Sequence, residues 1–226
     1  MTFGDRVLDF YKNIGLTNRL PKGVEAMNPY EMPQVITYVE LFLKKYFSDN
    51  QNRVFVFGIN PGRFGAGLTG VTFTDPVALE KFCGVKNDLL KKRELSSEFI
   101  YRFIEHWGGV EKFYKDYFLT AVSPLGFVRN GKNYNYYDEP TLLQVLKPFI
   151  VETLGRQIAF GARQHAAILL GTGKNQKMFA ELNQEHRFFK EIYALDHPRF
   201  IMQYRRRLLP DYLKKYKEVF SLALSK

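Results

Sequence analysis

Four short runs of apolar, β-forming residues constrain the fold of this chain more than any other feature. The runs are RVFVFGI at 53–59, YFLTAV at 117–122, RQIAFG at 156–161 and EIYAL at 191–195. Polar and apolar residues do not alternate within them, so a strand formed by such a run has no face suited to water. We therefore expect a parallel sheet that is covered by helices on both sides.

Helix signals lie between these runs. The Asp-Pro pair at 75–76 precedes VALEKF, and the Glu-Pro pair at 139–140 precedes TLLQVLKPFI. In each pair an acidic residue stands at the capping position and proline at the first helical position. Gly155 is expected to end the second of these helices, and Pro210 is expected to begin a last one, DYLKKYKEVFSLAL.

Strands that alternate with helices predict an α/β fold, here a three-layer α/β/α domain with a central, mainly four-stranded parallel sheet. The ligand of such a domain binds outside the carboxyl ends of the strands.

Residues 1–226 are expected to form one domain, because 46% hydrophobic content in a chain of this length can bury one sizeable core. Residues 1–52 carry two helix patterns, one before Leu16 and one from Pro33, and are interpreted as an N-terminal helical cover. Residues 53–226 are expected to form the α/β core and the C-terminal helix.

The formal net charge of +10 and the pI near 9.5 narrow the choice of partner. Such an excess attracts polyanions, nucleic acid most often and an anionic membrane surface less often. A merely soluble basic protein fits the charge equally well. Basic and aromatic residues that cluster near the expected site must decide between these interpretations.

The cysteine content and the hydropathy of the sequence exclude disulfide-rich proteins, four-cysteine metal proteins and proteins with a membrane-spanning helix. The single cysteine, Cys83, can build neither a disulfide framework nor a four-cysteine metal site. The N-terminal segment MTFGDRVLDFYKNIGL mixes charged with apolar residues, and no apolar run is long enough to span a bilayer. We expect a cytoplasmic monomer without a metal or other cofactor, nucleoid-associated in a bacterium or nuclear in a eukaryote.

The first strand runs directly into NPGRFGAGLTGVTF at 60–73, where three glycines spell the dinucleotide fingerprint G-x-G-x-x-G over 65–70. That fingerprint opens a helix directly after a strand, whereas here Asn-Pro-Gly intervenes and a β-branched Val-Thr pair follows. A second phosphate-loop fragment, GTGK at 171–174, lacks the first glycine and the hydroxyl residue that should follow it. Both signals for a nucleotide-dependent enzyme are weak.

A second interpretation uses the whole segment: the glycines let the backbone pass close to a flat ligand. The pattern G-I-N-P-G-x-F-G-x-x-x-T-G-V-x-F resembles the first motif of the uracil-DNA glycosylase superfamily. It is similar in particular to the single-strand-selective monofunctional uracil-DNA glycosylases. The resemblance implies that Asn60 positions the attacking water and that Phe73 stacks on the extruded base. Further expected contacts are Ile59, Pro61, Gly62 and Phe64 with the base and Arg63 with DNA.

The segment DHPRFIMQYRRR at 196–207 follows the last strand and joins a histidine to a cationic, aromatic stretch suited to a nucleic-acid backbone. It resembles the family's second motif, a His-Pro pair that leads into the loop that wedges into duplex DNA. The resemblance implies that His197 hydrogen-bonds the carbonyl of the departing base and that Arg199 or Phe200 fills the gap in the base stack. Gln203 and Arg205 are expected to contact DNA as well.

The segment YFLTAVSPLGF at 117–127 resembles a third segment of the family, in which an asparagine before a Pro-Leu pair reads the base edge. Ala121 occupies that position here. Backbone groups and Ser123 are therefore expected to read the base, with Pro124 contacting DNA.

Two further stretches are candidates for ligand contact. The longest irregular stretch, 123–138, follows the second strand, where functional loops tend to lie, and one of its residues could replace the missing asparagine. Gly161 and Arg163 stand at an expected helix start, whose N–H groups could accept a phosphate.

These observations together predict a DNA glycosylase that flips uracil or a related damaged base, such as 5-hydroxymethyluracil, out of DNA and hydrolyses its N-glycosidic bond. This reaction initiates base excision repair. No lysine occupies the motif positions, which favours simple hydrolysis over a lyase reaction. The alternative is a non-catalytic module that binds damaged or single-stranded DNA through the same loops.

The expected pocket is permissive. By resemblance, uracil-strict relatives place a tyrosine two residues beyond the water-positioning residue, where it blocks a substituent on C5 of the base. Gly62 offers no such block, and Ala121 leaves no polar side chain unpaired when another base binds. We expect C5-modified uracils to be accepted, and discrimination to be loose enough to extend to hypoxanthine and xanthine.

Overall fold

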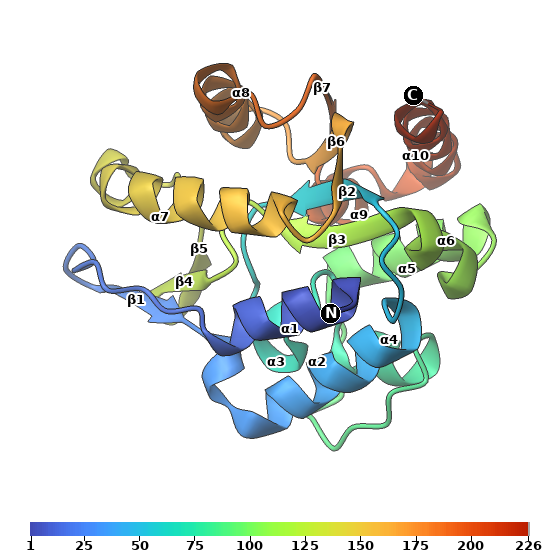
Figure 1. Ribbon diagram of the computed structural model, residues 1–226, viewed down its shortest axis with the longest axis horizontal. Coiled ribbons are helices and arrows are strands. Elements are labelled where there is room, and N and C mark those ends of the chain that lie inside the picture. The colour runs from blue at the N-terminus through green and yellow to red at the C-terminus, as the bar shows by residue number, and fades with distance from the viewer. Residues whose placement is uncertain (226) are drawn as a thin grey trace.

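The computed structural model describes residues 1–225 and has the predicted three-layer α/β/α architecture around a four-stranded parallel sheet (Figure 1). The strands of that sheet are ordered β3-β2-β6-β7. The expected fold class is therefore confirmed. In chain order the elements are α1 (Phe3–Lys12), β1 (Val24–Met27), η1 (Pro29–Glu31), α2 (Pro33–Tyr46), β2 (Arg53–Gly58), α3 (Ala66–Thr69), α4 (Pro76–Lys81), α5 (Leu95–Trp107), α6 (Val110–Asp116), β3 (Tyr117–Ala121), β4 (Gly126–Arg129), β5 (Lys132–Tyr134), α7 (Pro140–Ile158), β6 (Ala162–Leu170), α8 (Lys174–His186), β7 (Glu191–Leu195), α9 (Pro198–Tyr204), η2 (Arg206–Leu208) and α10 (Leu209–Leu224).

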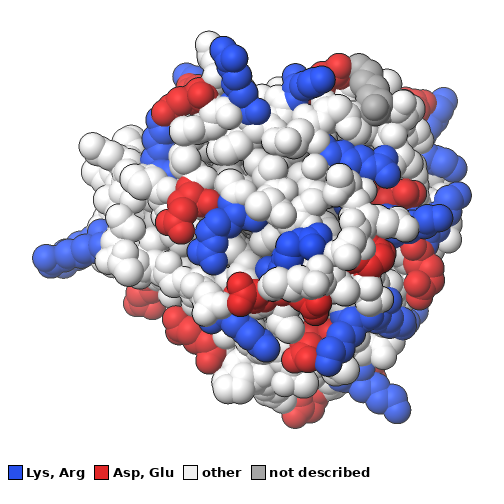
Figure 2. All heavy atoms as spheres, in the orientation of Figure 1, with Lys and Arg blue, Asp and Glu red and all other residues white. Residues whose placement is uncertain are grey.

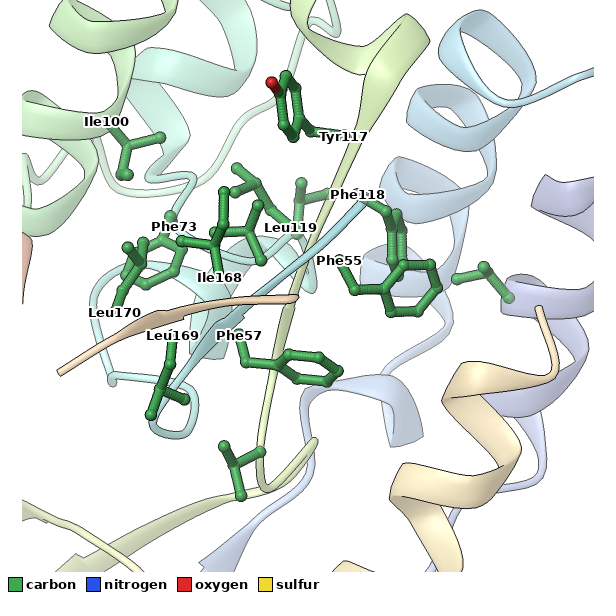
Figure 3. Close-up of a cluster of buried hydrophobic side chains, with 14 of the residues drawn as sticks. Phe55, Phe57, Phe73, Ile100, Tyr117, Phe118, Leu119, Ile168, Leu169 and Leu170 are labelled. Carbon is green, nitrogen blue, oxygen red and sulfur yellow. The ribbon is translucent and has the colours of Figure 1, made fainter. Parts of the chain in front are cut away.

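The central strands are buried on both faces, as their unbroken apolar sequences require. Every residue of β2 and β3 is buried. Side chains alternate across the sheet, so Phe55, Phe57 and Phe118 lie on one side of the strands in Figure 3, and Tyr117 and Leu119 lie on the other.

Aromatic side chains attach the helices to both faces. On the first face, Phe3 of α1 meets Phe118 edge-on at 5.0 Å between ring centroids, and Phe179 of α8 meets Phe57 at 5.2 Å. On the second face, Tyr117 contacts rings of α5, α6 and α10, with centroids 5.0 to 5.3 Å apart. The two predicted N-terminal helices are present as α1 and α2 and pack against each other.

The third predicted strand, at 156–161, is wrong. Helix α7 continues through Gly155 to Ile158, and the strand β6 begins at Ala162. Buried residues of α7 recur every three or four positions, ending with Leu154 and Gln157. Burial of these side chains offsets the cost of about 1 kcal/mol that glycine imposes inside a helix.

Residues 123–138, expected to be irregular, contain a β-hairpin. Strands β4 and β5 pair antiparallel, and β1 pairs with β4 to complete a second, three-stranded sheet. The turn is formed by Asn130 and Gly131, with φ angles of 50° and 69°. Asn-Gly is the sequence that favours such a left-handed turn, so the hairpin had a local signal that our sequence analysis did not use.

The glycine-rich segment after β2 does not open a long helix, because α3 has only four residues. The dinucleotide interpretation therefore lacks the helix that would hold a pyrophosphate.

Candidate active site

The carboxyl ends of the parallel strands surround a cavity of about 190 Å³. In Figure 1 the arrowheads of β2 and β3 point towards the side on which the small sheet lies. The cavity is lined by Gly58, Ile59, Asn60, Pro61, Gly62, Ala66, Thr72, Phe73, Glu94, Ser96, Ala121, Asn133, Asn135, His197 and Arg199. Five separate stretches of the sequence, 58–73, 94–96, 121, 133–135 and 197–199, thus contribute to one cavity at this edge of the sheet.

Asn60 lies two residues beyond the end of β2 and is held by the hairpin segment. Its Oδ1 accepts a hydrogen bond from the N–H of Tyr136 at 3.2 Å, and its Nδ2 donates to the carbonyl of Tyr134 at 3.3 Å. Nδ2 also donates to the carbonyl of Pro61 at 3.4 Å, so both of its hydrogens are engaged, whereas Oδ1 keeps one of its two acceptor sites for a ligand in the cavity. The side chain is therefore fixed in orientation and still able to bind water.

His197 directly precedes α9 and caps it. Its Nδ1 accepts a hydrogen bond from the N–H of Arg199 at 3.1 Å, so the proton of a neutral ring is on Nε2. Burial, and secondarily the positive charge of Arg199, lower the pKa of His197 to about 4. The ring is consequently neutral at physiological pH and presents one N–H donor.

Phe73 lies beside His197, with their ring centroids 5.9 Å apart and the planes tilted by 48°. Its backbone has a φ of 56°, a left-handed conformation that is uncommon for an aromatic residue. Gly58 makes this placement possible, because a Cβ atom there would lie 2.7 Å from Cζ of Phe73. The apolar ring wall and the imidazole donor thus face one cavity.

Ala121 has no polar side chain, and the polar groups near it belong to other residues. Ser123 is fully buried, its Oγ donates to the carbonyl of Leu125 at 2.8 Å, and it does not line the cavity. Asn133 and Asn135, from β5 and the segment after it, do line the cavity. They belong to the 123–138 stretch that was considered as a replacement for the missing asparagine, although neither residue was singled out.

Glu94 is a cavity residue that our sequence analysis missed. It immediately precedes α5, and its carboxylate lies against Gly62 and Gly65 of the loop after β2. Burial, then repulsion by Asp75, raise the pKa of Glu94 to about 7, and Arg199 opposes that rise. No local pattern singles out this residue, because Glu94 and the glycines meet only in the folded chain.

The residues expected at the DNA surface lie on and after α9. Phe200 is 38% exposed, and the Arg205 guanidinium lies 5.5 Å from the centre of its ring. Phe64 lies on the loop after β2, and its ring is approached by Arg63 of the same loop at 4.9 Å and by Lys92, from the segment between α4 and α5, at 3.5 Å. Phe64, Ser123, Arg63, Pro124, Phe200, Gln203 and Arg205 do not line the cavity itself, whereas Ile59, Asn60, Pro61, Gly62, Phe73, Ala121, His197 and Arg199 do.

The helix start expected at Gly161 and Arg163 is wrong. Gly161 precedes strand β6, and its carbonyl accepts a hydrogen bond from the N–H of Arg53 at the start of β2. Arg163 donates to the carbonyl of Asn52 at 3.0 Å. Both residues lie at the amino ends of the strands, opposite the cavity, and the feature that suggested a phosphate contact is absent there.

The positive charge is not gathered on the face of the molecule seen in Figure 2, where Lys and Arg alternate with Asp and Glu. Within residues 1–225, no three His, Cys, Asp or Glu side chains are grouped as metal ligands. None of the helices described in that range combines the length and apolar character needed to cross a membrane.

Comparisons with known proteins agree with this fold. The family model of the uracil DNA glycosylase superfamily matches residues 44–221. A search of curated proteins gave no match. Among solved structures, the chain is similar to the crystal structure of wild-type SMUG2 from Pedobacter heparinus, with 43% sequence identity and a TM-score of 0.97 over 100% of both chains. The chain belongs to the uracil DNA glycosylase superfamily, and its activity is that of a monofunctional DNA N-glycosylase, a hydrolase.

Proposed function

We propose that this protein releases uracil and related damaged bases, including 5-hydroxymethyluracil, from DNA after the nucleotide has been flipped into the cavity. The observation that carries the proposal is the neutral His197 ring, with its free N–H donor, beside Phe73 and a fixed Asn60 in one cavity. The cavity, about 190 Å³, is smaller than the roughly 300–1,000 Å³ of sites for drug-sized ligands. A single base is smaller than a drug-sized ligand.

The reaction requires stabilisation of negative charge on the departing base. Phe73 stacks on the base and holds its plane, while Nε2–H of His197 donates to the base oxygen on which charge develops. A donor that is neutral before the reaction and fixed by Arg199 needs no reorganisation. One such donor contributes on the order of 3–4 kcal/mol to transition-state stabilisation.

Asn60 supplies the second part of the reaction. The remaining acceptor site of its Oδ1 orients a water molecule towards the sugar carbon, and the carbonyls of Tyr134 and Pro61 with the N–H of Tyr136 prevent the amide from rotating. A uracil anion that is already stabilised leaves without a paired acid and base, so a neutral amide is sufficient to guide the attack.

A uracil-containing oligonucleotide tests this proposal under single-turnover conditions, with alkali used to reveal abasic sites. His197→Ala and Asn60→Ala are each expected to slow base release on the order of a hundredfold with DNA affinity largely intact. His106→Ala, an exposed change on α5, serves as the control. Unchanged rates in both site variants, or no cleavage by the wild-type protein, would overturn the assignment.

The proposal includes loose base selection. Ala121 is 4% exposed and lines the cavity without a polar side-chain group, so it imposes no penalty on a base other than uracil. Rates are to be compared for uracil, 5-hydroxymethyluracil, hypoxanthine and xanthine in the wild type and in Ala121→Asn. The asparagine variant is expected to favour uracil more strongly than the wild type does. Strict uracil selectivity in the wild type would overturn this account of the pocket and favour a residue of the 123–138 stretch as the replacement for the missing asparagine.

A further inference from the structure

The volume beside Gly62 is not empty, because the carboxyl group of Glu94 occupies it. A Cβ atom on Gly62 would lie 2.7 Å from Oε1 of Glu94, and one on Gly65 would lie 1.9 Å from Oε2. The absence of a side chain at these two positions therefore admits the acidic group of the residue that precedes α5 into the wall of the cavity.

The Glu94 carboxyl has no hydrogen-bond partner of its own. Among the hydrogen bonds formed within residues 1–225, none reaches Oε1 or Oε2 of Glu94, although its backbone N–H donates to Asp75 at 2.9 Å. The carboxylate of Asp75, by contrast, accepts two hydrogen bonds. One comes from the N–H of Glu94, and the other comes from the N–H of Ala78 and caps α4. Glu94 is half-buried and lines the cavity, so its carboxyl, which bonds to no other protein group, is open to a ligand that enters the cavity.

The position of Glu94 defines which part of a base it can meet. Gly62 lines the cavity two residues beyond Asn60, and the family resemblance implies that a side chain at this position faces the substituent on C5 of a bound pyrimidine. C5 of a pyrimidine and N7 of a purine lie on the same, major-groove edge of a base. A carboxyl group above Gly62 therefore faces a 5-substituent in one class of base and a ring nitrogen acceptor in the other.

We propose that Glu94 is a specificity-determining residue that reads the major-groove edge of the extruded base. Its carboxyl donates a hydrogen bond to N7 of a deaminated purine such as hypoxanthine or xanthine, and accepts one from the hydroxyl of 5-hydroxymethyluracil. Unsubstituted uracil offers neither partner at this edge. The inference rests on the proposed function, because it concerns the base that occupies the same cavity.

The surroundings of Glu94 allow both roles near neutral pH. The charged groups that act on it are Asp75, at the start of α4, and Arg199, on α9, while the neutral His197 lines the same cavity. With its pKa at about 7, Glu94 is protonated below that pH and can then both donate and accept, whereas above that pH it is ionised and can only accept. Release of hypoxanthine relative to uracil should accordingly fall as pH rises through about 7.

A substrate cycle tests the contact directly. Single-turnover rates are measured for hypoxanthine and 7-deazahypoxanthine, which replaces N7 with a C–H group, in the wild type and in Glu94→Leu. The intrinsic difference between the two leaving groups is common to both proteins and cancels in the cycle. The penalty for removing N7 is expected to be roughly tenfold larger in the wild type than in the leucine variant, the effect of one good hydrogen bond.

Glu94→Gln provides the conservative variant. Its amide is a donor at every pH, so the ratio of hypoxanthine to uracil release should no longer depend on pH, while hypoxanthine release persists. Glu105→Gln and Glu105→Leu make the same changes at an exposed position on α5 and should leave every ratio at the wild-type value. A parallel comparison of 5-hydroxymethyluracil with uracil at pH 8.5 should show a loss of preference in Glu94→Leu.

The outcomes separate the two proposals. A wild-type protein that releases neither uracil nor hypoxanthine contradicts the proposed function itself. Release of uracil and hypoxanthine with equal N7 penalties in the wild type and Glu94→Leu overturns the inference about Glu94 alone. Release of uracil without release of hypoxanthine shows that the proposed contact between Glu94 and N7 is wrong. An unchanged preference for 5-hydroxymethyluracil in Glu94→Leu shows that the proposed contact between Glu94 and the hydroxyl group is wrong as well.

Discussion

The Nδ1 atom of His197 accepts the N–H of Arg199, and burial keeps the ring neutral. We expect NMR of the ring nitrogens to show the Nε2–H tautomer at pH 7. Because burial lowers the pKa of His197 to about 4, the ring should remain neutral down to about pH 5. A titration midpoint at 6 or above, or an Nδ1–H tautomer, would contradict the assigned role of this donor.

Glu94 is expected to reduce stability at the pH at which the protein acts. Its pKa in the folded protein, about 7, lies above the ordinary 4.5, so the folded state retains a proton that the unfolded state loses between these values. Stability therefore falls as pH rises through this window, by an amount on the order of 3 kcal/mol, and the loss is complete above about pH 7.

Urea unfolding at two pH values tests this assignment. Glu94→Gln should be more stable than the wild type at pH 8, and the difference should shrink towards zero near pH 4.5. A difference of the same size at both pH values would mean that the glutamine packs better and that ionisation of Glu94 is not the cause.

At the scale of elements, α9 and the turn after it carry the cations expected to meet the DNA backbone. Arg205 lies over the exposed ring of Phe200, and Arg206 is paired with Glu98 at 2.8 Å. Arg205→Gln should reduce the slope of log affinity against log salt by roughly one, because one phosphate contact is lost. Arg163→Gln, at the opposite edge of the sheet, should leave the slope unchanged. Equal slopes in the wild type, Arg205→Gln and Arg163→Gln would show that Arg205 does not contact a DNA phosphate.

The hairpin of β4 and β5 holds Asn60, and its turn depends on Gly131. Gly131→Ala should lower the free energy of unfolding by about 1 kcal/mol, because its φ of 69° disfavours a Cβ atom. Gly155→Ala is the matched control: it makes the same change inside helix α7, where an added Cβ meets nothing within 4 Å. That variant should gain up to about 1 kcal/mol. Thermal and urea unfolding measure both values, and changes of the same sign would contradict the argument.

At the scale of the whole molecule, one buried arginine joins the N-terminal helices to the sheet. The side chain of Arg53 is fully buried, forms an ion pair with Asp49 at 2.7 Å and donates to the carbonyl of Tyr114 at 2.8 Å. Its guanidinium also lies 4.9 and 4.8 Å from the ring centres of Phe3 and Phe47.

Arg53→Met is therefore expected to destabilise the protein by about 3 kcal/mol, because it leaves a buried carbonyl unpaired and removes the contacts with both rings. Base release at a temperature where the variant remains folded should match the wild type, since Arg53 begins β2 and the cavity lies beyond its other end. A parallel loss of activity in the folded variant would show that the two ends of the sheet are coupled.

Local sequence was sufficient for the architecture and for the first and last loops of the site. The runs at 53–59, 117–122 and 191–195 became strands because apolar, β-branched and aromatic residues without alternation suit a doubly covered sheet. The run at 156–161 failed because a short apolar stretch at the end of a helix has the same composition as a buried strand. Only the pairing with β2 and β7 determined where β6 begins.

Only the tertiary structure determined which further polar side chains line the cavity. Asn60 and His197 follow strands and could be placed from their motifs, but Glu94 reaches the loop after β2 from a different helix. Asn133 reaches the same cavity from a hairpin that pairs with β1 near the N-terminus. Strands and helices follow from hydrogen bonds and burial patterns between near neighbours in the sequence, whereas a cavity wall is composed of whatever the packed elements bring together. The position of this site could therefore be predicted from the sequence, whereas the polar groups proposed to select its base could be identified only in the folded structure.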